Sequence, residues 1–222
     1  FFMLTGELMT SATITDRLVA LSRALIGRIR GGLAQVNVLV SMFFAGMNGS
    51  VVADTATVGA LVLPAMKKAG YPAAFSAAVT GVSSTIGGII PPSIMMIVLA
   101  NSTEISIAAL FAAGIIPGVL IGVVIMIINH YFAIKYNFER SDEPFSIRRA
   151  GRELYRSSFA LLIPLVLVGS VMGGVASVVE AGAITAMVAL LTGVFVYRTI
   201  KWKECTGAFR RAFRNSAMVF II

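Results

Sequence analysis

The chain has 222 residues, of which 58% are hydrophobic and 13% are charged, and its formal net charge is +8. A soluble domain carries about 25% charged residues, so this composition excludes an ordinary soluble domain and indicates a polytopic membrane protein. The 18 Lys and Arg fall in four clusters between apolar runs, at residues 17–30, 67–68, 135–156 and 198–214. Such placement is typical of loops that face the cytoplasm, and it argues against a nucleic-acid-binding protein.

The first 32 residues are expected to hold two elements. Residues 1–12 predict the end of a scaffold membrane helix. Residues 13–32 predict an amphipathic arm helix, because apolar residues recur every three or four positions on one face while Arg23 and Arg30 lie opposite. A basic amphipathic helix is expected to lie along the cytoplasmic surface of the membrane. A helix packed against protein is the alternative.

The next apolar run, residues 33–66, has basic residues at both flanks, Arg28 and Arg30 before it and Lys67 and Lys68 after it. Both ends are therefore expected on the cytoplasmic side, so the chain must enter the membrane and return. The run holds too few residues for two full spans of about 20 residues each. It predicts a re-entrant helical hairpin with "NGSVVADT" as its tip. Two short tilted spans are the alternative.

Residues 72–99 are expected to cross the membrane outward as a broken helix. In the stretch "SSTIGGIIPPS", Gly87 and Gly88 are poor helix formers, and Pro91 and Pro92 remove two backbone donors. Residues 107–131 are expected to return as a membrane helix, followed by a cytoplasmic loop and helix at 132–157. Residues 158–197 predict two spans with an external turn near Glu180. A cytoplasmic basic segment at 198–214 then leads to the start of a further membrane helix at 215–222.

Together these elements predict an all-α polytopic membrane protein that contains a re-entrant hairpin and a broken transmembrane helix. The returning helix carries Gly114, Gly118 and Gly122 at four-residue spacing, which predicts close helix packing. Glu180, near the predicted external turn, is interpreted as structural. Both ends of the chain look cut, so we expect an internal piece of a longer protein.

Asp54 is the one charged residue between positions 31 and 66. A charge at the centre of a bilayer is costly unless it faces a cavity or a partner, and Asp54 has no Lys or Arg in its own run. A bound cation, a water-filled pocket or protonation would each compensate it. The hydroxyls and freed carbonyls of the two broken stretches suit a hard cation. The alternative is that the two stretches are purely structural, because Gly, Pro and Ser are common in ordinary membrane helices.

Motifs of enzymes are missing from the chain. It contains a single histidine, His130, and a single cysteine, Cys205, so it has no disulfide framework and no Cys-based metal site. It has no HExxH, GxSxG or P-loop sequence. We therefore expect no enzyme activity and no organic cofactor.

Several stretches resemble the large membrane (M) subunit of the tripartite ATP-independent periplasmic (TRAP) transporters. They are "FFMLTGELM", "AGMNGSVVADTATVG", "GGIIPPSIMMIVLA", "LFAAGIIPGVL" and "GGVASVVEAGAITAMVALLTG". The resemblance covers essentially the whole chain. It implies a fold of the ion-transporter superfamily with two inverted repeats, each containing a hairpin and a broken helix. Residues 33–66 and 72–99 would form one such pair, within the transport domain.

The resemblance also implies a function. Members of this family take up organic acids, such as C4-dicarboxylates, sialic acid or other sugar acids, together with Na⁺ and by an elevator-type mechanism. Their partners are a small four-helix membrane (Q) subunit and a periplasmic substrate-binding protein, and they lie in the bacterial inner membrane. The alternatives are a Na⁺-coupled anion carrier of the same superfamily that works without a binding protein, and a membrane channel or scaffold.

Carried over by position, the resemblance implies two sets of site residues. Na⁺, the coupling ion, would be held largely by backbone carbonyls, in a set formed by Gly49, Ser50, Asp54, Ser83, Thr85, Gly88 and Pro91. The substrate carboxylate would lie nearest to Asn48, Ser50, Ser84 and Thr85. The hairpin tip departs from the Ser-Gly-Ser that is frequent in the family, and "SVVEA" replaces the frequent "TPTEA".

Overall fold

The structure of the chain is a computed structural model that describes residues 1–27, 29–138 and 146–221, with the side chains of 218–221 left out of the description. The described residues form helices and connecting turns, without strands, as the all-α prediction requires. The helices are α1 (Phe2–Ser11), α2 (Ile14–Ile26), α3 (Gly32–Asn48), α4 (Val51–Lys68), α5 (Ala73–Ser84), η1 (Thr85–Gly88), α6 (Ile94–Thr103), α7 (Ile107–Lys135), α8 (Ile147–Met172), α9 (Val178–Leu191), η2 (Thr192–Val196) and α10 (Trp202–Ile221).

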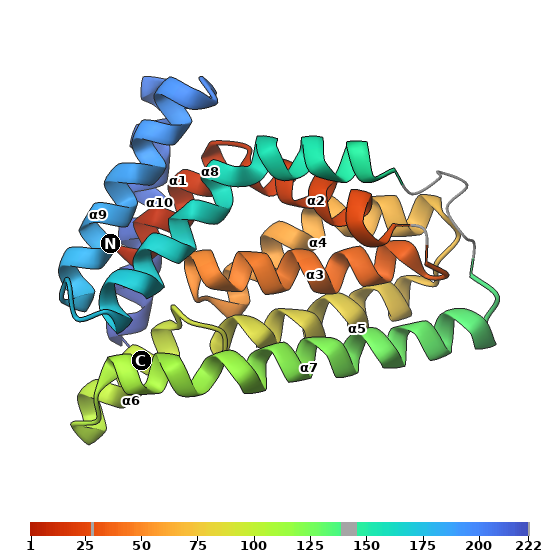
Figure 1. Cartoon of the computed structure of the whole chain (residues 1–222), viewed down its shortest axis with the longest axis horizontal. Coiled ribbons are helices and arrows are strands. Elements are labelled where there is room, and N and C mark those ends of the chain that lie inside the picture. The colour runs from red at the N-terminus through yellow and green to blue at the C-terminus, as the bar shows by residue number, and fades with distance from the viewer. Residues whose placement is uncertain (28, 139–145, 222) are drawn as a thin grey trace.

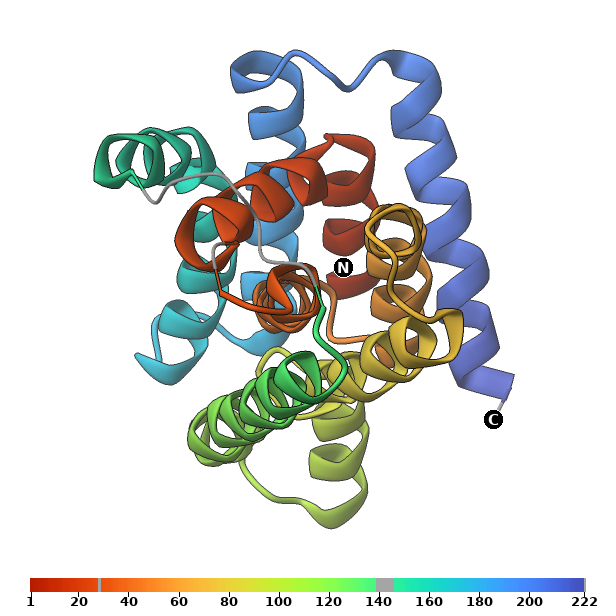
Figure 2. The same ribbon diagram turned by 90° about the vertical axis from the view of Figure 1, so that its right-hand side faces the viewer.

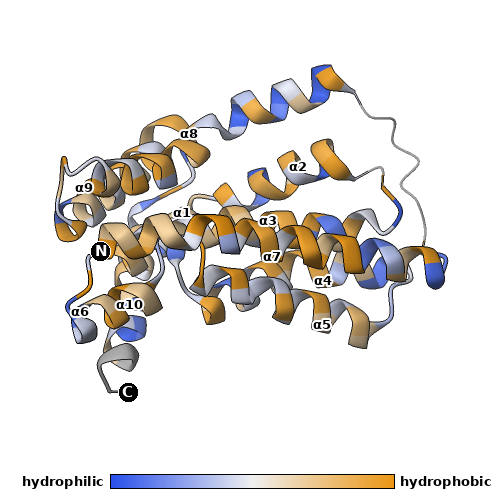
Figure 3. Cartoon of the chain, turned by 60° about the horizontal axis from the view of Figure 1, so that its bottom comes forward, coloured by the Kyte–Doolittle hydropathy of each residue, from blue (hydrophilic) through white to orange (hydrophobic). Residues whose placement is uncertain are grey.

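Three of the described helical segments are long and apolar enough to cross a membrane: Ile107–Lys135, Ile147–Met172 and Val178–Val196. The predicted class, an all-α polytopic membrane protein, is confirmed. Figure 1 shows α3, α5 and α7 side by side along the long axis of the molecule, with α9 and α10 running across one end. Figure 2, turned by 90°, shows α3 surrounded by other helices. Hydrophilic residues are concentrated on α2, on the first half of α8, on α10 and at helix ends (Figure 3).

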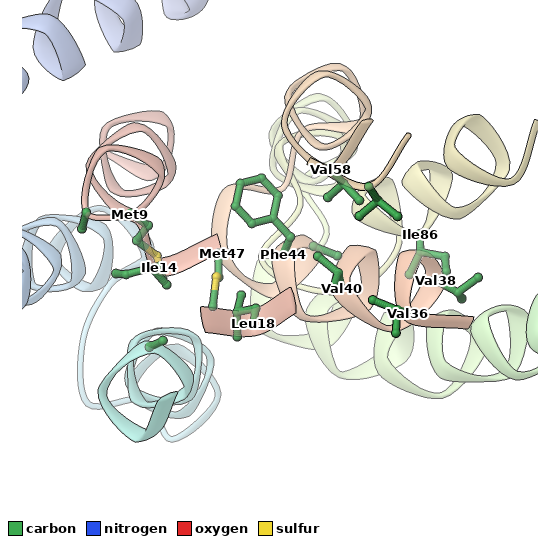
Figure 4. Packing of buried hydrophobic residues seen from close by; sticks show 14 of the residues in the cluster. Met9, Ile14, Leu18, Val36, Val38, Val40, Phe44, Met47, Val58 and Ile86 are labelled. Atoms are coloured by element: carbon green, nitrogen blue, oxygen red, sulfur yellow. The ribbon is translucent and has the colours of Figure 1, made fainter. Parts of the chain in front are cut away.

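Helix α3 is the centre of the core. Its apolar residues point in every direction around its axis, and such a helix is stable only when neighbours cover it on all sides. Val36, Val38, Val40 and Phe44 are all fully buried. Figure 4 shows these side chains packed against residues of α1, α2, α4 and η1. The side chains of α3 therefore form the shared core against which α1, α2, α4 and η1 pack.

Helices α3 and α4 form a hairpin whose turn consists of residues 49 and 50, inside the segment predicted as the tip. Gly49 ends α3 in the left-handed conformation, with φ of 58°, a conformation that glycine adopts without steric cost. Ser50 begins α4, because its Oγ accepts the backbone N–H of Ala53 at 3.3 Å. The two helices pack against one another and against α5.

The predicted broken helix is interrupted between α5 and α6. Residues 85–88 continue α5 as a tighter 3₁₀ turn, and α6 begins only after the two prolines. Ser93 holds both sides of this break: its Oγ donates to the carbonyl of Gly88 at 2.8 Å and accepts the N–H of Met96 at 3.4 Å. The break is therefore an ordered structure with its own hydrogen bonds.

Two predicted boundaries are not helix ends in the structure. The amphipathic stretch that begins at residue 147 is continuous with the following span in α8, because no Gly or Pro separates Gly151 from Pro164. The basic segment 198–214 and the apolar residues after it likewise share one helix, α10. Part of the predicted loop 132–157, residues 139–145, lies outside the described residues.

The predicted close packing of α7 is confirmed. Gly114, Gly118 and Gly122 are buried. A Cβ added at Gly114 would overlap the carbonyl oxygen of Ile89, and one added at Gly122 would overlap the side chain of Met42. The glycines therefore let α7 approach both the break and α3.

Gly114→Ala is expected to destabilise the protein, because the added methyl group would push α7 away from the break. Overpacking of this kind costs about 1–3 kcal/mol. The matched control is Gly169→Ala in α8, where a Cβ meets no atom within 4 Å and Ala is the better helix former. The measurement is the melting temperature of the detergent-solubilised protein. Equal melting of both variants and the wild type would contradict this packing.

Candidate functional site

The hairpin turn packs directly against the break between α5 and α6. The carbonyl of Gly49 accepts the backbone N–H of Ile94 at 3.3 Å. A Cβ at Gly49 would overlap the carbonyl oxygen of Pro92, so both the space and the left-handed backbone require glycine there. Gly87 lies against the backbone of Ser50. The two polar stretches, which are well separated along the chain, thus form one unit.

Asp54 lies in the first turn of α4 and is fully buried. Neither of its carboxylate oxygens has a hydrogen-bond partner among the described residues. The hydroxyls of Ser41 and Ser84 lie beside it, but they donate elsewhere, Ser41 to Ser83 Oγ at 3.3 Å and Ser84 to the carbonyl of Thr80 at 2.8 Å. A buried carboxylate without a partner is strongly unfavourable, so this position needs a cation, water or a proton.

A network of buried polar side chains joins α3 to α5 beside Asp54. Asn37 Nδ2 donates to Thr80 Oγ1 at 2.7 Å, and Asn37 Oδ1 accepts from Ser83 Oγ at 3.2 Å. Asn37, Ser41 and Thr80 were not among the site residues predicted from the sequence. The available signal was that Asn37 and Ser41 are four residues apart, which puts two polar groups on one face of an apolar helix.

Two of the predicted substrate residues lie at a cavity beside the hairpin turn, and the lining of this cavity does not include Asp54. Asn48 and Ser50 line this cavity, which has a volume of about 440 Å³ and is also lined by α1, α4 and α10. Asn48 Oδ1 accepts the N–H of Ser50 at 3.0 Å, which fixes the side chain in the turn. The cavity is where a solute can contact the predicted substrate residues Asn48 and Ser50.

The remaining predicted residues are divided among three places. Ser83 and Ser84 are buried in the network beside Asp54, apart from the cavity. Thr85 is exposed, and its hydroxyl donates to the carbonyl of Val82 at 2.7 Å. The carbonyl of Gly88 already accepts from Ser93, and Pro91 is buried at the break. A carbonyl oxygen has a second lone pair, so the Gly49 and Gly88 carbonyls each retain capacity for a cation.

The Asp54 carboxylate and the hydroxyls of Ser41 and Ser84 beside it offer oxygen ligands. Within the described ranges, no group of three or more His, Cys, Asp or Glu side chains is placed to hold a metal ion. Such a donor set suits a hard monovalent cation, whose single charge one carboxylate balances, and it gives no support to a zinc or iron centre.

Comparison with known proteins decides the family. The family described as "Tripartite ATP-independent periplasmic transporter, DctM component" matches residues 1–222. The chain belongs to this family. The resemblance stated from the sequence is therefore confirmed, and the family is one of transporter components, in agreement with the prediction that the chain is not an enzyme.

Curated relatives show the same relationship. The chain is 34% identical over 222 residues to a C4-dicarboxylate TRAP transporter large permease of Pseudomonas aeruginosa, with 100% of this chain and 52% of the relative covered. It is 32% identical over 222 residues to a sialic acid TRAP transporter large permease of Vibrio cholerae, again with 100% and 52% covered. A 2,3-diketo-L-gulonate TRAP transporter large permease of Escherichia coli is 34% identical over 226 residues, with the same coverage. The chain spans about half the length of these relatives.

Asn37→Leu is expected to destabilise the TRAP permease chain, because the hydroxyls of Thr80 and Ser83 would lose a buried partner. A broken buried hydrogen bond of this kind costs about 1–3 kcal/mol. The control is Asn101→Leu, at an exposed position, which should leave the stability nearly unchanged. Melting temperatures in detergent distinguish the two. An Asn37→Leu variant as stable as the wild type would show that the network contributes nothing.

Proposed function

We propose that the complete protein to which this chain belongs takes up an organic acid together with Na⁺ across a bacterial inner membrane. Its relatives are named as permeases for C4-dicarboxylate, sialic acid and diketogulonate, all of them organic acids. The same TRAP relatives support a tripartite system, in which a periplasmic binding protein delivers the substrate and a small four-helix subunit completes the membrane part. The basic clusters are proposed to face the cytoplasm.

The observation that carries Na⁺ coupling is the isolated carboxylate of Asp54. Insertion scales give about 2.5–3.5 kcal/mol for a charged residue at the centre of a membrane helix. A bound Na⁺ neutralises that charge, and rotation of the neighbouring serine hydroxyls would turn oxygen lone pairs toward the ion. Ser41 of α3 and Ser84 of α5 are buried hydroxyls beside Asp54, and Ser83 is hydrogen-bonded to Ser41.

An elevator-type movement is consistent with how the helices are grouped. Helices α3, α4 and α5 pack on one another, α3 also packs against α7 and α1, and α2 packs against both α3 and α8. We assign α2 as the arm that joins the moving group to the remaining helices. An uncompensated charge on the buried Asp54 would oppose movement of the group through the membrane, so Na⁺ binding would permit that movement and couple it to the ion.

Asp54→Asn is expected to lower the apparent affinity for Na⁺ by about tenfold or more, because the ion loses the one charge that balances it. Initial rates of succinate and sialic acid uptake are measured in proteoliposomes that contain the complete membrane complex and the binding protein, over a series of Na⁺ concentrations. The control Glu104→Gln removes a carboxylate from an exposed turn after α6 and should leave the Na⁺ dependence unchanged.

Replacement of Na⁺ by K⁺ or choline is expected to abolish accumulation of the substrate. Uptake that continued without Na⁺, or flux that only ran downhill as in a channel, would contradict the proposed function. Equal Na⁺ dependence in the wild type and in Asp54→Asn would remove Asp54 from the cation site.

A further inference from the structure

The cavity beside the hairpin turn has a second wall that the predicted site does not include. One wall consists of Asn48, Ser50 and the first turns of α4, and the other is built by α1 and α10. Polar groups on the cavity surface include the neutral side chains of Asn48, Ser50, Thr10 and Thr57. Among the described residues that line it, Glu7 is the one ionisable side chain.

Glu7 is held by two residues of α10. Its Oε2 accepts from Arg211 Nε at 2.6 Å, and its Oε1 accepts from Asn215 Nδ2 at 3.1 Å. Arg211 Nη2 also donates to Ser11 Oγ at 2.9 Å, one turn further along α1. Both carboxylate oxygens of Glu7 are therefore occupied, and the guanidinium that neutralises the charge is itself fixed in place.

This arrangement has an electrostatic consequence for any solute that enters. An unpaired carboxylate in the wall would repel an anion, and the repulsion is strong in a partly enclosed site because little water screens it. We propose that Arg211 determines the charge specificity of this cavity, by neutralising Glu7 so that a carboxylate-bearing solute can approach Asn48 and Ser50. The inference deepens the proposed function, since it names residues of α1 and α10 as the wall that admits the organic acid.

A purely structural role of the ion pair predicts something different. If Arg211 only holds α10 against α1, loss of either Glu7 or Arg211 would weaken the same helix contact. The double variant would then be as impaired as either single variant. If Arg211 neutralises Glu7, loss of Arg211 alone is harmful and removal of both charges together is nearly neutral. The double variant therefore separates the two roles.

The experiment measures the charge preference of the cavity directly. In the complete protein with its native cysteines replaced, including Cys205→Ser, a single cysteine is introduced by Thr57→Cys in the cavity lining. Rates of reaction are compared for an anionic methanethiosulfonate that carries a sulfonate and a cationic one that carries a trimethylammonium group. The ratio of the anionic to the cationic rate reports the local potential, independently of any transport.

Arg211→Gln should lower this ratio about fivefold or more, and the double variant Glu7→Gln/Arg211→Gln should return it to within about twofold of the parent. The control Arg210→Gln removes the same charge from an exposed neighbouring position on α10 and should leave the ratio unchanged. An unchanged ratio in Arg211→Gln, or a double variant that behaves like Arg211→Gln, overturns the inference.

Glu7→Gln alone keeps the test decisive if Arg211→Gln does not fold. It leaves the guanidinium without its counter-charge, so the ratio should rise, and an unchanged ratio overturns the inference. In uptake assays with succinate or sialic acid, the KM should follow the same order of variants while kcat changes little. Because the reagent rates do not depend on transport, a protein that transports neither anion would count against the proposed function and not against this electrostatic role.

Discussion

The turn at Gly49 and the break between α5 and α6 fit together because no side chain separates them. The left-handed backbone of Gly49 reverses the chain, the carbonyl oxygen of Pro92 occupies the space where a Cβ would lie, and the Gly49 carbonyl accepts the N–H of Ile94. The hairpin and the broken helix therefore hold one another. This contact sets where the polar groups of the hairpin turn lie in relation to those of the break.

The contact separates two polar regions that lie only a few residues apart on the hairpin. On one side, Asn48 and Ser50 face the cavity shared with α1 and α10. On the other side, Asp54 is buried beside the serines of α3 and α5. In the proposed function the first region meets the anion and the second meets Na⁺. An ion bound at Asp54 would order the same turn that forms the cavity wall, which gives a short physical route by which Na⁺ can favour substrate binding.

Much of the fold could be predicted from the sequence, because the flanking charges, the glycines and the prolines act locally. The hairpin turn and the break lie where Gly49 and the Gly-Gly and Pro-Pro pairs indicate. The network beside Asp54 could not be predicted, because the hydrogen-bond partner of Asn37 is Thr80, 43 residues later in the chain. Thr85 was predicted for both sites, yet the 3₁₀ turn carries it to an exposed position. The pairing of Glu7 with Arg211 joins residues 204 positions apart, and no local pattern reveals it.

In the proposed function, Na⁺ binds at Asp54, beside the hairpin turn and the serines of α3 and α5. Hydrogen–deuterium exchange of the complete protein, measured by mass spectrometry in Na⁺ and in K⁺ without substrate, tests it most directly. We expect slower exchange in Na⁺ for peptides that cover residues 45–57 and 80–94, no change for peptides of α8 and α9, and loss of the effect in Asp54→Asn. Identical exchange of these two segments in both salts would contradict it.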